Sequence, residues 1–490
     1  MWTEDWAFNN GAGISEQGVS LLTHLGAAGV RDYSALSQPS SPNVMYVMAM
    51  MPGNTPKAVR RQLFLDLAHG VKAVNWWPLV SFESSGSSCA VDYRPYGDSA
   101  GPAQMYSEIR HLMAEVAQFS DVIWEAHAGA HSRVALLYAE TTDVWLPTNV
   151  QSQYYAGVAT GQRAAFTPPT FGFGTHGTAK RALFLLLRHA QLQIDIVTEE
   201  DCIDGEIGRY KILFVSEPAV STTAANAIRR YVQRGGTVYG TAGAGLLDQF
   251  NRTNLAMSDL FGVRETSQFT GRRGVNNSIS FGKMDLPWAE TLDELRLGPH
   301  RIPVFGIQSR FNVTRPSNVT VVATFARTGG PAVTSARIAR GRAIYVGMLP
   351  GLSYFQPALP RIPVDRSQSD HGSNHLIPHT SSVDAAARDH LVVGVSGADR
   401  LGGASPVTCN EPLVDAGFRA ANKTGGAIVL SNWSGREEIR GLVVTLSAPF
   451  TFRAATLASG GRLSVRRRAG SVDFVFRQPF LVGDAIILRR

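Results

Sequence analysis

Hydrophobic positions in the first 128 residues follow helical and strand-like periods in turn. The predicted order is a helix over 15–28, a strand over 44–50, a helix over 56–70, a strand over 71–77 and a helix over 103–125. In the second helix, Val59, Leu63 and Leu67 recur on one face, while Pro56 suits its first position and Gly70 its end. Helices and strands that alternate with tight connections indicate parallel α/β construction. The same stretch reads as the last part of a larger barrel.

Apolar runs in the middle of the chain predict a second α/β unit. Strands are predicted over 133–138, 194–197, 212–215, 237–239 and 342–347, with helices over 178–191 and 222–234. In the latter helix, Ile228, Tyr231 and Val232 are expected to face inward. This order is typical of a doubly wound, flavodoxin-like domain. Residues 263–335 are rich in strand-like alternation and turn residues, which indicates a β-rich insertion.

The C-terminal part has a different pattern. Residues 357–400 are rich in Pro, Ser, His and Asp and are predicted to form a poorly structured linker. Short alternating runs after residue 412 are separated by turn signals and predict a small antiparallel β-sandwich. The expected domains are a partial (β/α)8 barrel over 1–128, a flavodoxin-like domain over 129–356, the linker over 357–400 and the sandwich over 401–490.

Composition narrows the classes of partner. The chain has 490 residues and a formal net charge of +7, but its 40 arginines (46 Lys+Arg, of which six are Lys) are scattered, and the densest run is Arg466 to Arg468. A nucleic-acid site would need a basic stripe with interleaved aromatic residues, so we expect no nucleic-acid partner. The apolar runs are much shorter than a membrane span, so we expect no membrane partner.

Neither metal nor cofactor chemistry is indicated. Cys89, Cys202 and Cys409 are far apart and supply no paired spacing for zinc or disulfides. Residues 240–245 (GTAGAG) follow a strand, but their spacing matches no nucleotide-binding fingerprint, so a close backbone turn is the better interpretation. The acidic neighbours of Cys202 disfavour a thiolate. We therefore predict no cofactor and no metal.

Several motifs, in order along the chain, resemble the glycoside hydrolase family 42 β-galactosidases. Residues 68–77 (AHGVKAVNWW) look like that family's seventh helix and eighth barrel strand. Residues 133–138 and 210–218, together with 341–347 and 349–351, are similar to its middle, trimerisation domain. Residues 414–416 and 428–432 look like the opening of its C-terminal sandwich. The resemblance implies a glycosidase that acts on a carbohydrate substrate and forms a homo-oligomer, a trimer in that family.

This chain departs from the family where the catalytic carboxylates are concerned. The family's acid/base lies at the end of the fourth barrel strand, whereas the resemblance begins near the sixth. The family's nucleophile is a glutamate that ends the seventh strand, but the matching residues 46–52 (YVMAMMP) contain no carboxylate. Either another strand supplies a carboxylate, or the chain does not catalyse.

Glu4 is the best candidate carboxylate. Glycosidic cleavage needs one carboxyl group to protonate the leaving oxygen and another to attack or to activate water. Glu4 lies beside Asp5 and between Trp2 and Trp6, whose rings could exclude water, raise a carboxyl pKa and stack on a sugar. The alternative is that Glu4 and Asp5 cap a turn or face solvent.

Trp76 and Trp77 are further candidates for sugar contact. Adjacent strand residues point to opposite faces, so at most one of them faces a barrel mouth and the other packs against helices. The alternative is that both tryptophans are structural. Glu83 could bond a sugar hydroxyl, although a solvated loop position is the alternative. His69 is expected to satisfy the end of its helix.

The sequence therefore favours an O-glycosyl hydrolase of the β-galactosidase-like type, with Glu4 as the catalytic residue. The predicted substrate-binding residues are Asp5, Trp6, Trp76, Trp77 and Glu83. The alternative is a non-catalytic relative that binds carbohydrate or serves only in assembly. The sugar, the stereochemical outcome and the cellular compartment stay open.

Overall fold

A computed structural model describes eleven stretches of the chain. They are residues 2–5, 44–48, 56–77, 102–126, 132–145, 173–269, 291–355, 357, 383–401, 405–421 and 425–490. The predicted helix over 15–28 lies outside them. Within these stretches, no helix combines the length and the apolar character needed to cross a membrane.

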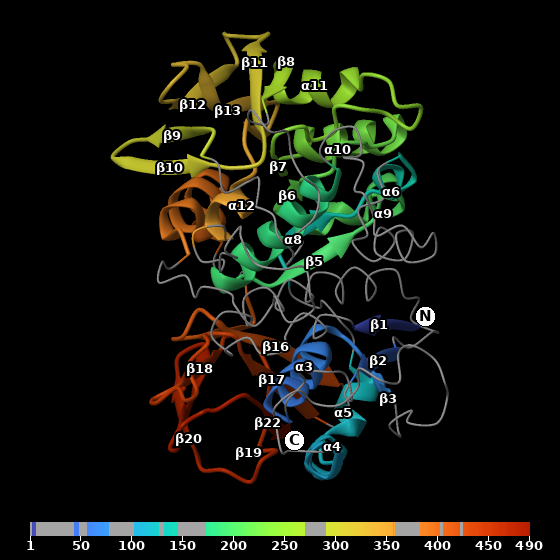
Figure 1. Cartoon of the computed structure of the whole chain (residues 1–490), viewed down its shortest axis with the longest axis vertical. Coiled ribbons are helices and arrows are strands. Elements are labelled where there is room, and N and C mark those ends of the chain that lie inside the picture. The colour runs from blue at the N-terminus through green and yellow to red at the C-terminus, as the bar shows by residue number, and fades with distance from the viewer. Residues whose placement is uncertain are drawn as a thin grey trace, which may run out of the picture.

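The largest unit is a mixed sheet of nine strands in the order β10-β9-β12-β13-β14-β7-β6-β4-β5 (Figure 1). Its parallel strands are β4 (Val134–Leu137), β5 (Ile194–Val197), β6 (Ile212–Val215), β7 (Thr237–Gly240) and β14 (Gly341–Val346). Its antiparallel strands are β9 (Asp293–Leu297), β10 (His300–Val304), β12 (Val319–Phe325) and β13 (Pro331–Ile338). Because β13 pairs with β14, most of the predicted insertion extends the same sheet. Only β8 (Val263–Phe269) and β11 (Gln308–Val313) form a separate pair.

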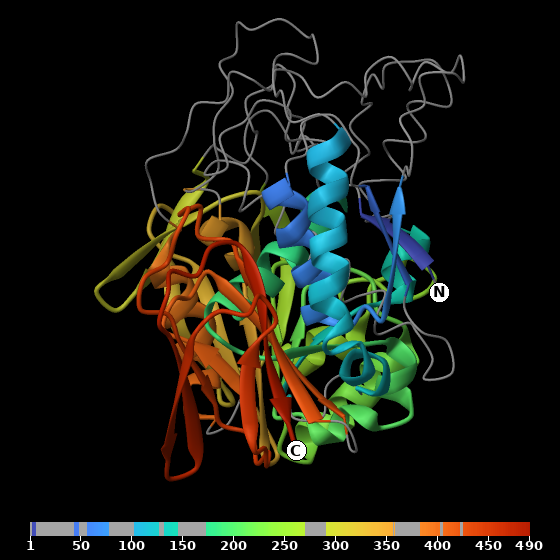
Figure 2. The ribbon, with the colours of Figure 1, turned by 90° about the horizontal axis from the view of Figure 1, so that it is seen from below.

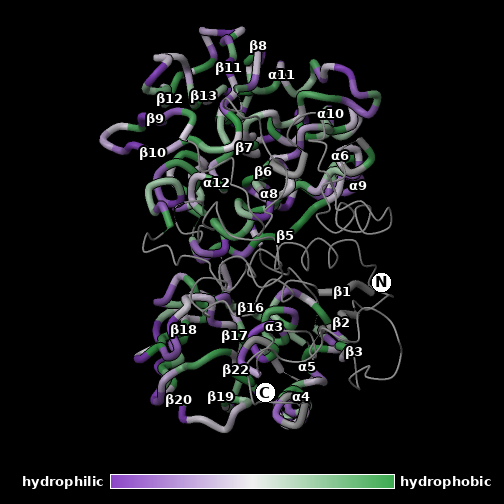
Figure 3. Tube along the Cα trace, viewed as in Figure 1, coloured by the Kyte–Doolittle hydropathy of each residue, from purple (hydrophilic) through white to green (hydrophobic). Residues whose placement is uncertain are grey.

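Both faces of the parallel part of this sheet are buried. Val134 and Leu136 face one apolar cluster, and Ala135 and Leu137 face the other. The first cluster includes residues of α8 (Phe173–His189), α12 (Pro350–Phe355) and η5 (Ala387–Gly394). The second includes residues of α9 (Glu199–Ile203), η1 (Glu206–Arg209), α10 (Thr222–Gln233) and α11 (Leu255–Phe261). The short helix α6 (Glu140–Trp145) follows β4. Figure 3 shows the resulting contrast between hydrophobic β5 and the hydrophilic outer loops.

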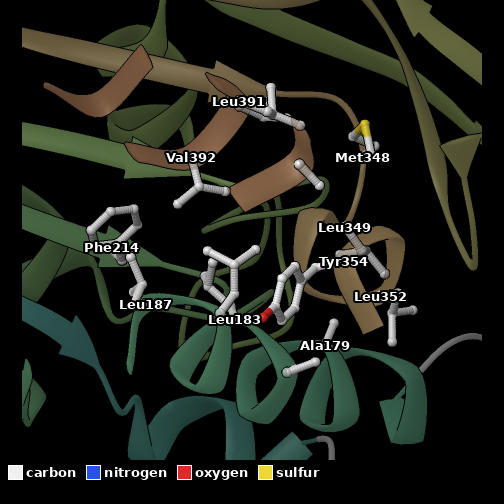
Figure 4. Packing of buried hydrophobic residues seen from close by; sticks show 14 of the residues in the cluster. Ala179, Leu183, Leu187, Phe214, Met348, Leu349, Leu352, Tyr354, Leu391 and Val392 are labelled. Carbon is white, nitrogen blue, oxygen red and sulfur yellow. The ribbon is translucent and has the colours of Figure 1, made fainter. Parts of the chain in front are cut away.

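Part of the predicted linker is helical and buried. Figure 4 shows Leu391 and Val392 of η5 in the apolar cluster with α8, α12 and β6. The Tyr239 hydroxyl also donates to the Leu391 carbonyl at 3.3 Å. A second short helix, η6 (Ala398–Arg400), follows. The prediction of a poorly structured segment was therefore wrong for residues 383–401, because two apolar side chains anchor the helix to the sheet. The domain boundaries stay predictions.

The C-terminal region is a sandwich of two four-stranded antiparallel sheets, as predicted. One sheet contains β15 (Val407–Cys409), β18 (Val443–Leu446), β21 (Ser471–Phe476) and β20 (Leu463–Arg468), in that order. The other contains β16 (Val414–Ala421), β17 (Gly425–Asn432), β22 (Gly483–Arg489) and β19 (Ala454–Leu457). Every residue of β17 is buried. Ile428 and Leu430 face the sandwich core, whereas Ala427 and Val429 face the helices outside it.

Those outer helices belong to the N-terminal region. It contains β1 (Trp2–Asp5), β2 (Val44–Met48), α3 (Pro56–His69), β3 (Ala73–Trp77), α4 (Pro102–Ala117) and α5 (Ser120–Glu125). The three strands form one parallel sheet. Figure 2 shows α3 and α4 between this sheet and the sandwich. In α3, Val59, Leu63 and Leu67 are buried as predicted, and Gly70 has φ 115° beyond its end.

The predicted helix over 103–125 is interrupted. Helix α4 ends at Ala117 and α5 begins at Ser120. Between them the buried Phe119 has φ −138° and enters the apolar cluster of α3 and β17. The Gln118 side chain donates to the Ala458 carbonyl at 2.9 Å. These contacts with the sandwich stabilise the break more than a continued helix through Phe119 would.

Candidate functional site

The predicted catalytic residue lies in the parallel sheet β1-β2-β3. The backbone pairing puts Glu4 in one cross-strand row with Tyr46 and Asn75. The next row contains Asp5, Val47 and Trp76. Because adjacent cross-strand rows of a sheet belong to opposite faces, Glu4 and Asp5 lie in rows on different faces.

Trp76 identifies the face that packs against helices. Its indole Nε1 donates to Met113 Sδ on α4 at 3.4 Å, and Trp76 and Val74 pack against the apolar cluster of α3, α4 and α5. Asn75, between them in sequence, is exposed. The sequence-based expectation that one tryptophan of the pair packs against helices is met by Trp76.

The other predicted site residues are described only in part. For Glu4, Asp5 and Trp77 the backbone is described, in β1 and β3. Trp6 and Glu83 lie outside the described residues. The strand pairing places Glu4 and Asn75 in the same cross-strand row. Sequence reasoning did not single out Asn75, although strand alternation next to Trp76 is the signal that could have found it.

The described part of this sheet offers few groups for acid–base chemistry. Strand β2 has the sequence VMYVM and contributes no carboxylate. Among the described residues, no three His, Cys, Asp or Glu side chains are grouped in a way that could hold a metal ion. Glu4 and Asp5 are the carboxylate-bearing residues of the three strands.

The end of α3 is fixed by the sandwich. The buried His69 Nε2 is 2.8 Å from Asp415 Oδ2 on β16, and Arg188 of α8 donates to the other oxygen of the same carboxylate at 2.6 Å. Arg419 donates to the last carbonyls of α3, at Leu67 and Ala68. Arg419 thus supplies donors to this helix end, and the described bond of the His69 ring joins the helix to Asp415. One buried carboxylate joins the three regions of the chain.

The glycine-rich loop at 240–245 has no backbone amide left for a phosphate. The Thr241, Ala242 and Ala244 amides donate to the Val215, Met348 and Thr241 carbonyls, respectively, and that of Gly245 to the Glu217 carbonyl. The Gly243 amide donates to the Tyr345 hydroxyl at 3.1 Å. The backbone-turn interpretation of this loop is confirmed.

The carboxyl ends of β4 and β5 are occupied by the chain's own acidic residues. Glu199 is buried and accepts from the Thr141 and Ser221 amides at 2.8 and 2.6 Å. Glu140 accepts from the Glu199 amide at 3.2 Å. Burial, followed by the charges of Glu200 and Glu199, raises the pKa of Glu140 to about 7. These carboxylates fill the helix ends at which an anionic ligand would otherwise bind.

Nucleophilic chemistry by the Cys202 thiol, beside the nine-stranded sheet, is disfavoured. Cys202 is buried in α9, and its burial, together with nearby Asp201 and Glu199, raises the pKa of its thiol. A neutral, buried thiol is a poor nucleophile.

With this geometry established, comparison with known proteins shows what the chain is similar to. Residues 175–363 match the family model described as the β-galactosidase trimerisation domain. No curated protein sequence matches the chain.

Solved structures extend the likeness to the whole fold. The chain is similar to Gan42B, a family 42 β-galactosidase from G. stearothermophilus, with a TM-score of 0.61 and 14% identity over 96% of this chain. It is also similar to a β-galactosidase from Bacillus circulans sp. alkalophilus (TM-score 0.55, 14% identity, 96% of this chain and 68% of that one). An α-L-fucosidase isoenzyme 2 from Paenibacillus thiaminolyticus gives a TM-score of 0.52 at 13% identity, over 93% of this chain and 62% of that one.

These findings confirm the resemblance to the family 42 β-galactosidases. The middle of the chain matches the trimerisation domain of that family, and the fold as a whole is shared with glycosidases. The chain spans 57% of the length of Gan42B.

Proposed function

We propose that this chain is part of a β-galactosidase-like glycoside hydrolase that cleaves O-glycosidic bonds with carboxylate acid/base chemistry. In this proposal, β1, β2 and β3 are the last strands of a (β/α)8 barrel. The parallel core β5-β4-β6-β7-β14 is a flavodoxin-like domain, since its order corresponds to 2-1-3-4-5.

The observation that carries the proposal is the register of β1. Glu4 shares a row with the exposed Asn75, while the neighbouring row contains Trp76, which packs on the helices. In a barrel the helices lie outside, so the row of Glu4 belongs to the inner face. This supports Glu4 as the carboxylate of the site.

The same register assigns the other predicted site residues to one or the other face of the sheet. Trp77 follows Trp76 in β3 and therefore belongs to the face of Glu4 and Asn75. We assign sugar contact to Trp77 and Asn75, with Trp6 and Glu83 as further contacts. Asp5 and Trp76 lie in the row on the helix side, where we assign them support of the sheet.

Hydrolysis of a nitrophenyl β-galactoside tests the proposal. The protein should release nitrophenol, and Glu4→Gln should abolish release while leaving the unfolding transition unchanged. A matched control is Glu294→Gln on β9, an exposed glutamate outside this sheet. Equal turnover by the wild type and Glu4→Gln would remove Glu4 from the mechanism.

A second candidate function is a non-catalytic relative that binds carbohydrate or serves in assembly. It is favoured by the carboxylate-free β2, since glycosidic cleavage needs two carboxyl groups. Titration with galactose and lactose, followed by tryptophan fluorescence and by product release, separates the two functions. Binding without release would favour the second.

The proposed partners follow from the same likeness. We propose a carbohydrate substrate, no cofactor, no metal, no nucleic acid, no membrane and a homo-oligomer, with a trimer as the expected form. The match of residues 175–363 to a trimerisation domain supports the assembly. Sedimentation of the purified chain measures it directly.

A further inference from the structure

The last fifty residues hold most of the net charge of the chain. Residues 441–490 contain eight arginines, two aspartates and no lysine, glutamate or histidine, which gives +6 against +7 for the whole protein. All of these residues belong to the sandwich. The other 440 residues together carry only +1, so they are nearly neutral, and the basic character belongs to the C-terminal part.

Three of these arginines form a row along the edge of a sheet. Strand β20 is the last strand of the sheet β15-β18-β21-β20, and Arg466 and Arg468 lie two residues apart on the same face of it. The Arg477 Nε donates to Ser464 Oγ at 2.6 Å, and Ser464 is the preceding residue on that face. Two residues of a strand rise by about 7 Å, so the backbone positions of Arg466 and Arg468 are separated by roughly that distance along β20.

One carboxylate faces this arginine row, defined as Arg466, Arg468 and Arg477. Asp473 on β21 is the cross-strand partner of Arg466, and its Oδ2 is 2.6 Å from Arg468 Nη2. Its side chain is 4% exposed, whereas that of Arg468 is 66% exposed, and Thr445 Oγ1 donates to its other oxygen. Arg466 and Arg477 are also exposed. The row therefore presents excess positive charge to solvent.

Further arginines lie on or beside the same strand. Arg467 lies over the Phe452 ring at 4.6 Å and donates to the Phe452 carbonyl, beside the exposed Arg453. The backbone pair of Arg462 and Arg477 closes the other end of the β20–β21 ribbon. Figure 1 shows β20 on the side of the sandwich away from α4.

We propose that the arginine row, on β20 and directly after β21, binds a linear polysaccharide that carries carboxylates. Several exposed guanidinium groups side by side along one strand match a polymer with repeated charges. The planar fork of arginine bonds a carboxylate through two parallel N–H groups. A single compact anion would not need a row.

The observations favour a polysaccharide over a nucleic acid. Single-stranded nucleic acids are held by aromatic side chains on which bases stack. The exposed large hydrophobic residues in this region are Val465 and Leu481, and neither is aromatic. The choice of carbohydrate also rests on the proposed function, whereas the arginine row does not.

The arginines also have a structural use, which the test must separate from binding. An edge strand has unpaired backbone groups, and charged side chains protect it from pairing with other chains. Replacing the arginines by lysine keeps this protection and the net charge but removes the planar fork. Replacing them by glutamine removes the charge.

Binding of polygalacturonate by the full chain, measured by retention and by titration, tests the proposal. The wild type should bind polygalacturonate at low salt and lose affinity as the salt concentration rises. It should not bind neutral galactan. The double variant Arg466→Gln/Arg468→Gln should bind at least about tenfold more weakly, since each arginine near an anionic surface contributes substantially. Arg466→Lys/Arg468→Lys should fall between the two.

The matched control is Arg296→Gln/Arg301→Gln, which removes two exposed, paired arginines from β9 and β10. It should bind like the wild type. Equal losses in the two glutamine variants would overturn the proposal, because net charge alone would then explain binding. Tighter binding of a single-stranded RNA oligonucleotide than of polygalacturonate would overturn the class of partner. Galactoside hydrolysis, assayed separately, reports on the proposed function and should be unchanged in both variants.

Discussion

Arg188 and Asp415 are 227 residues apart in the chain, and their side chains meet at 2.6 Å. The Asp415 side chain is fully buried and also contacts His69 at 2.8 Å. One residue each from α3, α8 and β16 thus meet at this carboxylate, so the regions of the chain are expected to unfold together.

Asp415→Asn should lower the free energy of unfolding by about 3 to 5 kcal/mol, because it leaves a buried guanidinium without its counter-charge. Urea denaturation measures this loss. The control is Asp399→Asn, which breaks an exposed contact with Arg400 and should change stability by less than about 1 kcal/mol. Similar effects of the two substitutions would contradict the role of Asp415.

Gly351→Ala should destabilise the packing of α12 on α8. A Cβ at this position would lie 2.4 Å from the Leu183 amide nitrogen and 2.6 Å from the Ala179 carbonyl oxygen, so a backbone must shift. Overpacking of this kind costs about 1 to 3 kcal/mol. Gly208→Ala meets no atom within 4 Å and serves as the matched control in thermal unfolding. A neutral Gly351→Ala would show that the two helices are less tightly packed than described.

Tyr345→Phe should loosen the loop at 240–245. The Tyr345 hydroxyl accepts from the Gly243 amide and donates to Glu265 at 2.5 Å, so its removal leaves a buried amide and a largely buried carboxyl without this partner. The expected loss is about 1 to 3 kcal/mol. Hydrogen exchange at Gly243 should accelerate. Tyr231→Phe, which removes a longer bond of 3.4 Å to the Thr237 carbonyl, should have a smaller effect.

Glu140 makes stability depend on pH. Burial raises its pKa from 4.5 to about 7, so the folded protein binds this proton more tightly than the unfolded chain does. The stabilising effect of the protonated Glu140 carboxyl on the folded state is therefore complete below pH 4.5, and it is lost as pH rises to about 7. Relative to Glu140→Gln, the wild type should become less stable across that window. A constant difference between the two proteins from pH 4 to 8 would contradict the raised pKa.

Elements with a strong local pattern could be predicted from the sequence. The apolar face of α3, the buried positions of α10 and the strands β4 to β7 follow from periodicity, and their clusters are as expected. The apolar run of β17 likewise predicted a strand of the sandwich. It did not predict that helices from the other end of the chain cover Ala427 and Val429.

Features set by distant contacts could not be predicted. The break before α5 has no glycine or proline to mark it and depends on Phe119 and Gln118 meeting the sandwich. Asp415 and His69 are 346 residues apart, which no local pattern connects. Of the candidate site, strands β2 and β3 were predicted from the sequence. Strand β1 and the register that separates Glu4 from Asp5 required the pairing of β1 with β2.

The proposed role of Glu4 as the carboxylate of the site is tested most directly by chemical rescue. Glu4→Ala should lower kcat for a nitrophenyl β-galactoside by at least about a hundredfold, with a smaller change in KM. Added formate, which can enter the space left by the carboxylate, should restore part of the turnover in Glu4→Ala but not accelerate the wild type. Wild-type turnover by folded Glu4→Ala, or a loss that formate leaves untouched, would contradict the account.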